Sequence, residues 1–435
     1  MKDFHIEKEI PWDVIVIGGG PAGMMAAGRA AERDRRVLLL EKNSILGKKL
    51  LITGGGRCNL TNNKPEVRTM LAQYKESDKF LFSAFTQFGV TETLHFFNER
   101  GMATKEEAEG RVFPASNKAE SVWDVLLGYM KKGGVTVCTK AEVIDISCDQ
   151  HTKQMIVTLK DMSKVRAHSC IVATGGISRP ETGSTGEGFQ WLKKLGHTII
   201  DNDMALVPIV LKDIWAAKLA GVTLNNIKLT TFKNGVKQKV YKGKLLFTHV
   251  GISGPTVLNM SADVRELLYG TEGAEYTQTS SETPGGDVKI ILDLFPSLDI
   301  SVLREKLQAL LTEKSNKKIK NVLSLLVPSA LVDSTLMLAQ IDGDTPNHSV
   351  RSEERKALVF LLKAIPLSVA GLLGSEKAVV SSGGVTLSQV NFKTMQSRLL
   401  PQLYLVGDVL NIDRPSGGYS LQLCWTTGYI AGNSC

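Results

Sequence analysis

The chain has 435 residues, of which 43% are hydrophobic, and this length predicts two or three domains with sizeable cores. Its formal charge of +8 is a mild excess, and its densest basic cluster, residues 314–320, is typical of a solvated turn rather than a nucleic-acid site. The six cysteines form no C-x-x-C pair and no metal-ligand spacing with histidine, which argues against a metal site and against a disulfide framework.

The N-terminus and the apolar runs indicate the compartment. Residues 1–12 carry several charges and do not resemble a signal peptide. No apolar run approaches the roughly 18 residues that a membrane helix needs. We therefore expect a cytoplasmic protein in a reducing compartment, without membrane contact and without nucleic acid as its expected partner.

Residues 13–41 predict a strand, a helix and a second strand in succession. Val14 to Ile17 form an apolar, β-branched run that ends at a glycine cluster, as a buried strand does. Pro21 to Arg33 are rich in alanine and methionine and predict a helix, with the proline near its first turn. Val37 to Leu40 predict the next strand, which ends at Glu41.

The turn between the first strand and this helix contains the pattern G-x-G-x-x-G. Gly18 allows a tight turn, Gly20 lets a pyrophosphate approach the backbone, and Gly23 lets helix and strand pack closely. Glu41 lies 18 residues after Gly23, near the spacing at which an acid binds an adenosine ribose and disfavours a 2′-phosphate. The pattern predicts dinucleotide binding but does not distinguish FAD from NAD.

A second glycine-rich stretch follows closely. Gly54 to Gly56 stand between Thr53 and Arg57 and favour a loop in which the backbone approaches a flat ligand. Arg57 and Asn59 would bring a charge and an amide to that ligand. An ordinary surface loop is the alternative.

The next region is mostly helical and then β-rich. Residues 78–131 predict helices that the sequence EGRVFPAS interrupts, and residues 135–176 predict hairpins or a meander returning to the main sheet. The last of these runs ends at Thr174 and Gly175. A glycine-rich segment that includes Thr185 and Gly186 then opens another helix, whose N-terminus would suit a ligand.

From about residue 203 the character of the sequence changes. Residues 203–296 are strand-rich, with Asn234-Gly235 as a hairpin signal, and residues 297–375 predict several helices. The final segment, residues 376–435, again contains strand-like runs, VVSSGGV at 379–385 and LYLVGDV at 403–409, and then Gly417-Gly418 before a helix. We therefore expect an α/β fold: a discontinuous Rossmann-like domain, residues 1–202 and 376–435, with an inserted β-rich and helical module.

Several separated motifs carry a family resemblance. GGGPAG, ATGG and LVGD resemble the FAD domain of glutathione-reductase-like flavoproteins. KKLLITGGGRCNLTN, TGSTGEGF, LFTHVGISGP and GGYSLQ resemble a bacterial family of NAD(P)/FAD-dependent oxidoreductases of the BaiN/RdsA type, also called aminoacetone-oxidase-like. The resemblance spans nearly the whole chain, from about Trp12 to Gly432.

The resemblance implies non-covalently bound FAD and a set of cofactor contacts. Glu41 with Lys42 would bind the ribose, the backbone of Val143 the adenine, and Asp408 the ribityl chain. Glu187 stands where TGDG of fumarate-reductase-type enzymes has aspartate, and Asp408 stands where relatives have glutamate; either acid can accept a hydroxyl hydrogen bond. The cofactor residues implied are Gly18, Gly20, Gly23, Glu41, Lys42, Thr53, Gly54, Gly55, Arg57, Asn59, Val143, Thr174, Gly175, Thr185, Gly186, Gly407, Asp408, Gly418, Tyr419 and Ser420.

The candidate catalytic residues are His249, Arg57 and Tyr419. His249, with Ser253 nearby, belongs to the inserted module and could exchange protons near neutral pH. Arg57, like Arg111 and Arg179, could hold an anionic substrate, although a surface ion pair is the simpler reading of each. Tyr419 would either donate a proton or pack on the flavin.

We expect an FAD-dependent oxidoreductase that acts on a small organic substrate between the FAD domain and the inserted module. Reduction of an activated C=C bond and oxidation of a small amine both remain open. No second G-x-G-x-x-G is present, so NAD(P)H is expected only as a transient electron donor. The alternative is a tRNA- or partner-binding protein in which FAD is structural or sensing. The oligomeric state is left open.

Overall fold

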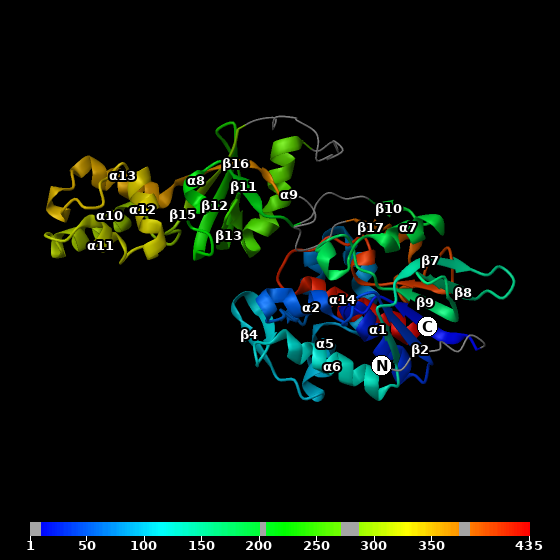
Figure 1. Ribbon diagram of the computed structural model, residues 1–435. Helices are drawn as coiled ribbons and strands as arrows, with labels where there is room; N and C mark the ends of the chain where they lie inside the picture. Colours follow the sequence, from blue (N-terminus) through cyan, green and yellow to red (C-terminus); the bar gives the residue numbers. More distant parts are fainter. Residues whose placement is uncertain (1–9, 201–205, 271–286, 374–382) are drawn as a thin grey trace. The chain divides into compact units, whose positions relative to one another are not determined.

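The computed structural model describes residues 10–200, 206–270, 287–373 and 383–435. The chain divides into two compact units, Met1–Ala205 with Ala378–Cys435, and Leu206–Lys377 (Figure 1). The first unit is therefore discontinuous in sequence, with the second inserted into it. The predicted fold class, a discontinuous Rossmann-like α/β domain with an inserted β-rich and helical module, is confirmed.

The first unit is built on a seven-stranded sheet of β1 (Trp12–Ile17), β2 (Val37–Glu41), β6 (Thr136–Thr139), β7 (Val143–Cys148), β8 (Met155–Leu159), β9 (Lys164–Val172) and β18 (Leu403–Leu405). β1 pairs in parallel with β2 and β9, β6 with β2, and β18 with β9. β7 and β8 form an antiparallel meander that leads into β9. Strands β1, β2 and β18 are largely buried, as expected for a parallel sheet that is covered on both faces.

Two helices from opposite ends of the chain pack together in this unit. They are α1 (Pro21–Glu32) and α14 (Tyr419–Ser434), drawn blue and red in Figure 1. A Cβ at Gly428 would lie 2.4 Å from the carbonyl oxygen of Ala22, and one at Gly432 would lie 2.4 Å from that of Ala26. Glycine at these two positions of α14 thus allows close helix packing, which joins the C-terminal segment to the N-terminal one.

The predicted helical region 78–131 contains three helices and a β-hairpin. The hairpin is formed by β4 and β5 and includes the sequence that interrupted the helical pattern. Of the predicted strand at 379–385, residues 379–382 lie outside the described residues. Its last two residues, Gly384 and Val385, form β17. The smaller elements of this unit are α2 (Lys48–Ile52), β3 (Thr61–Asn62), α3 (Val67–Leu71), α4 (Asp78–Gln87), α5 (Val90–Glu99), β4 (Thr104–Glu107), β5 (Arg111–Pro114), α6 (Ala119–Lys132), α7 (Glu187–Lys194), β10 (Ile199–Ile200) and β17 (Gly384–Val385).

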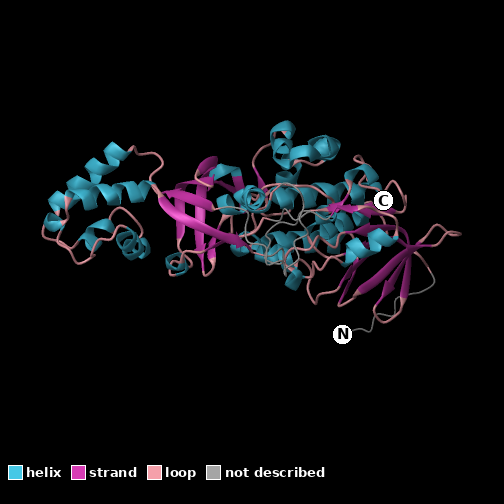
Figure 2. Cartoon of the chain, turned by 90° about the horizontal axis from the view of Figure 1, so that it is seen from above, coloured by secondary structure: helices cyan, strands magenta, loops and turns pink. Residues whose placement is uncertain are grey.

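The second unit contains a closed barrel in the order β11-β14-β13-β12-β15-β16, visible among the magenta strands of Figure 2. Barrel strands and helices share one hydrophobic core. The strands are β11 (Ile209–Leu211), β12 (Thr223–Lys233), β13 (Val236–Thr248), β14 (Gly251–Ser253), β15 (Val288–Asp293) and β16 (Ile365–Leu372). The helices are α8 (Ile214–Ala217), α9 (Pro255–Tyr269), α10 (Ile300–Glu313), α11 (Ile319–Leu323), α12 (Ser329–Leu338) and α13 (Ser352–Lys363).

One part of the predicted helical segment 297–375 is wrong. Residues Ile365–Leu372 form β16, which pairs with both β15 and β11 and thereby closes the barrel. Ile365, Leu367 and Val369 are buried while the residues between them are more exposed, which is the alternation of a strand. This short alternation follows directly on α13 (Ser352–Lys363), so helical spacing alone does not separate the two elements.

The six cysteines are all described, and none forms a disulfide bond. None of the helices in the described parts of the chain has the length and apolar character that crossing a membrane requires.

Candidate cofactor-binding site

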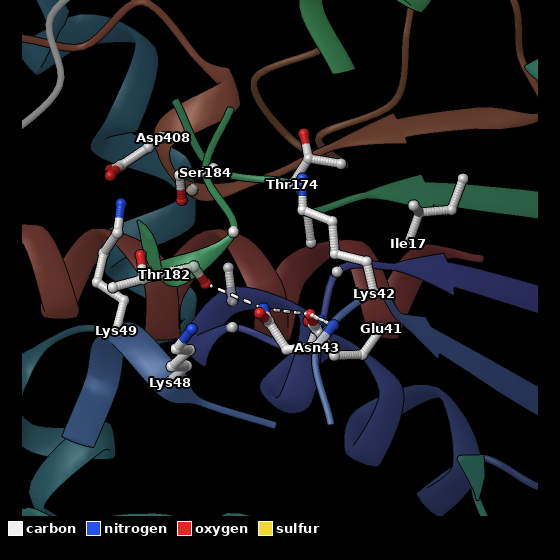
Figure 3. A pocket seen from close by; sticks show the side chains of 18 of the residues that line it. Ile17, Glu41, Lys42, Asn43, Lys48, Lys49, Thr174, Thr182, Ser184 and Asp408 are labelled. Atoms are coloured by element: carbon white, nitrogen blue, oxygen red, sulfur yellow. Dashed lines mark hydrogen bonds between the residues drawn. The ribbon is translucent and has the colours of Figure 1, made fainter. Parts of the chain in front are cut away.

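A pocket lies where the parallel strands β1, β9 and β18 reach their carboxyl ends, the usual position of a ligand site in such a sheet. Figure 3 shows the side chains that surround it. Nine of the predicted cofactor residues line it, namely Gly18, Gly20, Glu41, Lys42, Val143, Thr174, Gly175, Gly407 and Asp408. The pocket therefore receives side chains from both ends of the chain.

The three motif glycines have different surroundings. Gly18 has φ of 104°, and a Cβ there would lie 2.5 Å from the carbonyl oxygen of Ala173. A Cβ at Gly23 would lie 1.9 Å from the carbonyl oxygen of Gly18, so α1 can approach the turn only with glycine at this position. A Cβ at Gly20 would meet nothing within 4 Å and would project into the pocket. Gly18 and Gly23 thus shape the turn, and Gly20 leaves space beside it.

Glu41, at the end of β2, is buried, and both of its carboxylate oxygens accept hydrogen bonds. Its Oε2 accepts a hydrogen bond from the backbone N–H of Gly19 at 2.7 Å. Its Oε1 accepts from the backbone and side-chain amides of Asn43, at 2.8 and 2.7 Å. The neighbouring Lys42 donates to Glu187 at 2.7 Å and to Thr185 at 2.6 Å. Glu41, the acid predicted to bind the ribose, therefore also holds the glycine turn between β1 and α1.

Two adjacent lysines of α2 contribute positive charge to the pocket. Lys48 and Lys49 both line it. Lys49 Nζ donates to the carbonyl and hydroxyl oxygens of Ser178 at 2.7 and 3.1 Å, and its ammonium points toward Asp408 in Figure 3. Burial lowers the pKa of Lys49, while Asp408 acts in the opposite direction. A partly desolvated cation of this kind is suited to an anionic ligand.

Asp408, after β18, forms a part-buried ion pair. Its carboxylate accepts from Arg414, whose side chain is only 1% exposed. Arg414 also donates to the carbonyl oxygen of Ile412 at 2.6 Å and to the hydroxyl of Ser420 at 3.1 Å. Burial, together with Asp408, raises the pKa of the neighbouring Cys424 to about 12, so this thiol stays neutral and is not a nucleophile.

The glycine loop 53–59 does not line the pocket but lies at the start of α14. Gly54, Gly55 and Gly56 have φ of 57°, 67° and 82°. The side-chain oxygen of Asn59, in the amide orientation that satisfies its neighbours, accepts from the backbone N–H of Gly418 at 3.1 Å. The structure thus brings together two predicted segments that are far apart in sequence.

Arg57, a candidate catalytic residue, is committed to other contacts. Its guanidinium pairs with Glu107, donates to Asn117 at 3.1 and 2.7 Å, and stacks on Phe113 at 4.2 Å. Arg57 lies outside the pocket lining described above. These contacts give the guanidinium a structural role within the β4–β5 region.

Tyr419 is the first residue of α14 and is buried. Its ring lies 6.1 Å from that of Tyr74, nearly perpendicular to it, and its carbonyl accepts from the Tyr74 hydroxyl at 2.8 Å. Burial raises the pKa of Tyr419 to about 12, so the phenol is protonated at neutral pH. A protonated phenol at a helix N-terminus can donate a proton or a hydrogen bond.

The remaining candidates lie elsewhere. Arg111 donates to the carbonyl of Ala108 at 3.0 Å, and Arg179 lies 3.7 Å from Glu181. His249 is exposed in the turn between β13 and β14 of the second unit, and Ser253 ends β14. The other predicted cofactor residues that do not line the pocket are Gly23, Thr53, Gly54, Gly55, Arg57, Asn59, Thr185, Gly186, Gly418, Tyr419 and Ser420.

Several pocket residues were not predicted. Lys48 and Lys49 belong to the motif KKLLITGGGRCNLTN, but no sequence signal indicates that this turn of helix lines the pocket. Residues of this kind include Gly19, Pro21, Asn43, Lys48, Lys49, Thr182, Ser184, Trp191 and Cys424. Among the described residues, no group of three or more His, Cys, Asp or Glu side chains is placed to hold a metal ion.

The pocket suits a dinucleotide such as FAD. The open space beside Gly20 adjoins the N-terminus of α1, where free N–H groups favour phosphate. An acid lies at the end of the neighbouring strand, and a cation lies across the pocket.

The chain matches the family HI0933-like protein Rossmann domain over residues 12–434. It is 31% identical to the Ribosomal RNA dihydrouridine synthase of Escherichia coli over 422 residues, which cover 96% of each chain. It is 30% identical to the 3-dehydro-bile acid delta(4,6)-reductase of Clostridium scindens over 423 residues, covering 96% of this chain and 98% of that one.

Solved structures show the same fold. A flavocytochrome c3 fumarate reductase in its open conformation aligns with a TM-score of 0.53 and 16% identity, over 98% of this chain and 78% of that one. The 3-ketosteroid-delta4-(5alpha)-dehydrogenase of Rhodococcus jostii RHA1 aligns with a TM-score of 0.51 and 15% identity, over 99% and 98%.

Proposed function

The chain belongs to the HI0933-like family and is an FAD-dependent oxidoreductase, and from this premise we propose that it reduces a carbon–carbon double bond conjugated to a carbonyl group. The two relatives named above support this choice. Dihydrouridine is uridine whose ring double bond, next to a carbonyl, has been saturated. A delta(4,6)-reductase of a 3-dehydro bile acid likewise saturates double bonds conjugated to a ketone. The shared chemistry favours a reductase over an amine oxidase.

The observation that carries the cofactor assignment is the open space at Gly20. Because its missing Cβ would enter the pocket without meeting another atom, the backbone there is free to contact a pyrophosphate. We assign the turn at Gly18 and Gly20 to the pyrophosphate. Glu41 would accept from the adenosine ribose through lone pairs that its protein contacts leave, and the Val143 backbone would border the adenine.

The opposite end of the pocket would hold the flavin. Asp408 and Lys49 lie there, and they offer an acceptor for the ribityl chain and a cation. When bound and reduced by the electron donor, FAD would supply the electron pair for reduction of the double bond. The N-terminal N–H groups of α14 and the Lys49 ammonium would favour negative charge near the ring.

A proton must also reach the substrate. Tyr419 is the candidate in the first unit, because it is the first residue of α14 and its phenol carries a proton at neutral pH. His249 is the candidate in the second unit, where it is exposed in a turn. A pH profile that changes on substitution of one and not of the other would assign this role.

The electron donor we propose is NAD(P)H, which would bind transiently because the sequence has no second dinucleotide motif. The test is anaerobic. NADH and NADPH are added separately to the FAD-loaded protein, and bleaching of the flavin band is followed. An α,β-unsaturated ketone is then added, with the corresponding saturated ketone as control.

We expect one of the two nucleotides to bleach the flavin band. The band should then recover rapidly with the unsaturated ketone and not with the saturated one. Recovery at equal rates with both ketones would contradict the proposed substrate class. If aminoacetone bleached the oxidised protein while both nucleotides failed to do so, the amine-oxidase reading would replace ours.

A further inference from the structure

The positive charge of this chain is concentrated in one stretch of the second unit. Residues 212–244 contain eight lysines and a single acid, Asp213, so most of the net charge of +8 resides there. Within this stretch, β12 and β13 form a hairpin, and residues 223–248 contain six lysines and no acid. The hairpin is defined here as residues 223–248.

The lysines lie on both strands of the hairpin. Lys237, Lys239 and Lys242 of β13 are exposed. Lys228 of β12 is paired in register with Lys242 of β13. The pairing of the two strands therefore brings together lysines that are separate in sequence.

Among the described residues, acids on neighbouring elements pair with two of the six lysines. Lys228 pairs with Asp293 at 2.9 Å, and Lys239 pairs with Asp263 of α9. The acid nearest the turn, Asp287, pairs with Lys289 of β15. The other four lysines form no ion pair within the part of the chain that the structure describes; they are Lys233, Lys237, Lys242 and Lys244.

The cluster at 314–320 provides a contrast. Lys318 and Lys320 both pair with Asp344 at 2.8 Å, and Lys314 pairs with Glu313 at 3.2 Å. This cluster is dense in sequence, and three of its four lysines pair with acids close by. The hairpin has fewer consecutive lysines and more uncompensated charge.

The composition of the hairpin indicates its partner. Its cations are all lysines, which bind phosphates as point charges. The amides of Asn225, Asn226 and Gln238 are exposed on the same hairpin, and amides commonly join lysines at a nucleic-acid backbone. Small barrels also bind single strands on their surfaces.

We propose that the β12–β13 hairpin is a docking surface for the phosphodiester backbone of single-stranded RNA. This inference deepens the proposed function and rests on it, because uracil is a ring with a conjugated double bond that is presented on such a backbone. An acidic protein or a lipid surface would be a different partner. Only Val236 and Val240 are large exposed apolar residues on the hairpin, which is little for a membrane anchor.

The test measures binding of the full FAD-loaded chain to a fluorescent uridine-rich RNA oligonucleotide at several salt concentrations. Four neutralised phosphates predict a slope of about −2.8 in log affinity against log salt, or a roughly 50-fold loss between 50 and 200 mM. The hairpin variant carries Lys233→Ala, Lys237→Ala, Lys242→Ala and Lys244→Ala. The charge-matched control carries Lys314→Ala, Lys317→Ala, Lys318→Ala and Lys320→Ala.

We expect the hairpin variant to bind RNA at least tenfold more weakly with a flatter salt slope, and the control variant to bind like the unmodified protein. Equal losses in both variants would overturn the inference. Tighter binding to DNA of matching sequence, or to phosphatidylserine vesicles, would also overturn it.

Reduction of a small unsaturated ketone is measured on the same three proteins. Loss of RNA binding with this reaction retained in the hairpin variant supports the inference. An unmodified protein that reduces the ketone but binds no RNA would overturn the inference alone. One that binds RNA through the hairpin but reduces neither ketone nor uridine would overturn the proposed function alone.

Discussion

The carboxylate of Glu41 accepts a hydrogen bond from the backbone N–H of Gly19 at 2.7 Å. The acid at the end of β2 therefore holds the glycine turn at the end of β1. Its second oxygen is held by Asn43, so three N–H groups converge on one buried carboxylate. Glu41 therefore stabilises the wall of the pocket and is also placed to contact a ligand in it.

Glu41→Gln is expected to weaken both the turn and cofactor binding. A glutamine amide can accept from Gly19 or from Asn43 but must turn its NH₂ group toward the other donor. The unsatisfied contact should cost about 1–3 kcal/mol of unfolding free energy. Urea unfolding and FAD titration of the variant measure this. Glu142→Gln, at an acid paired with Lys160 on the surface, is the control; equal effects of the two substitutions would refute the prediction.

Substitutions at Gly20 and Gly23 should affect different properties: the first should abolish FAD binding, and the second should lower the stability of the fold. Gly20→Val places a side chain in open pocket space, and the extended backbone there, with φ of −77° and ψ of −178°, accepts valine. FAD content should fall to near zero with little change in stability. Gly23→Ala forces a Cβ against the Gly18 carbonyl and should destabilise the fold by about 1–3 kcal/mol. If the Gly20→Val protein retained FAD, the proposal that the pyrophosphate contacts the turn at Gly18 and Gly20 would be wrong.

Arg414→Met should destabilise the FAD-free protein. It leaves the partly exposed carboxylate of Asp408 without the cation that pairs with it, which should cost about 1–3 kcal/mol. The double variant Arg414→Met with Asp408→Leu removes both charges and should recover most of that loss. Denaturant unfolding of the three proteins tests this. A double variant no more stable than Arg414→Met would mean that the ion pair is not the cause.

His197 predicts a pH dependence of stability. It is buried, its Nε2 lies 2.7 Å from the hydroxyl of Ser397, and burial lowers its pKa below the ordinary value of 6.5. The unfolded chain therefore takes up the proton first as the pH falls. This contribution to stability is complete above pH 6.5 and is lost progressively below it.

His197→Gln should flatten the decline of the unfolding midpoint below pH 6.5. His151→Gln, at an exposed histidine between β7 and β8, is the matched control. The same decline in His197→Gln as in the unmodified protein would contradict the burial argument.

The sequence predicted local structure well where one short motif determines it. The strand, turn and helix around Gly20 follow from apolar residues and glycines within a few positions of one another. Lys49 illustrates what was missed, because its role depends on α2 placing it against Ser178, far away in sequence. Arg57 shows another limit, because its ion pair with Glu107 and its hydrogen bond to Asn117 depend on residues that only the fold brings near.

The same distinction explains the second unit. Its helices could be read from spacing, whereas β16 was missed because a short strand after a helix has only three alternating apolar residues. The lysines of β12 and β13 are not consecutive, so a search for dense basic tracts passes over them. Pairing of the two strands is what gathers their charge.

The most direct test of the account is product analysis after a single turnover. The FAD-loaded protein is reduced photochemically without oxygen and mixed with an α,β-unsaturated ketone, and the product is identified by mass spectrometry. We predict one saturated ketone formed per flavin reoxidised. A flavin that stays reduced in the presence of the ketone, while aminoacetone reduces the oxidised protein, would contradict the central claim that this chain is a reductase of conjugated double bonds.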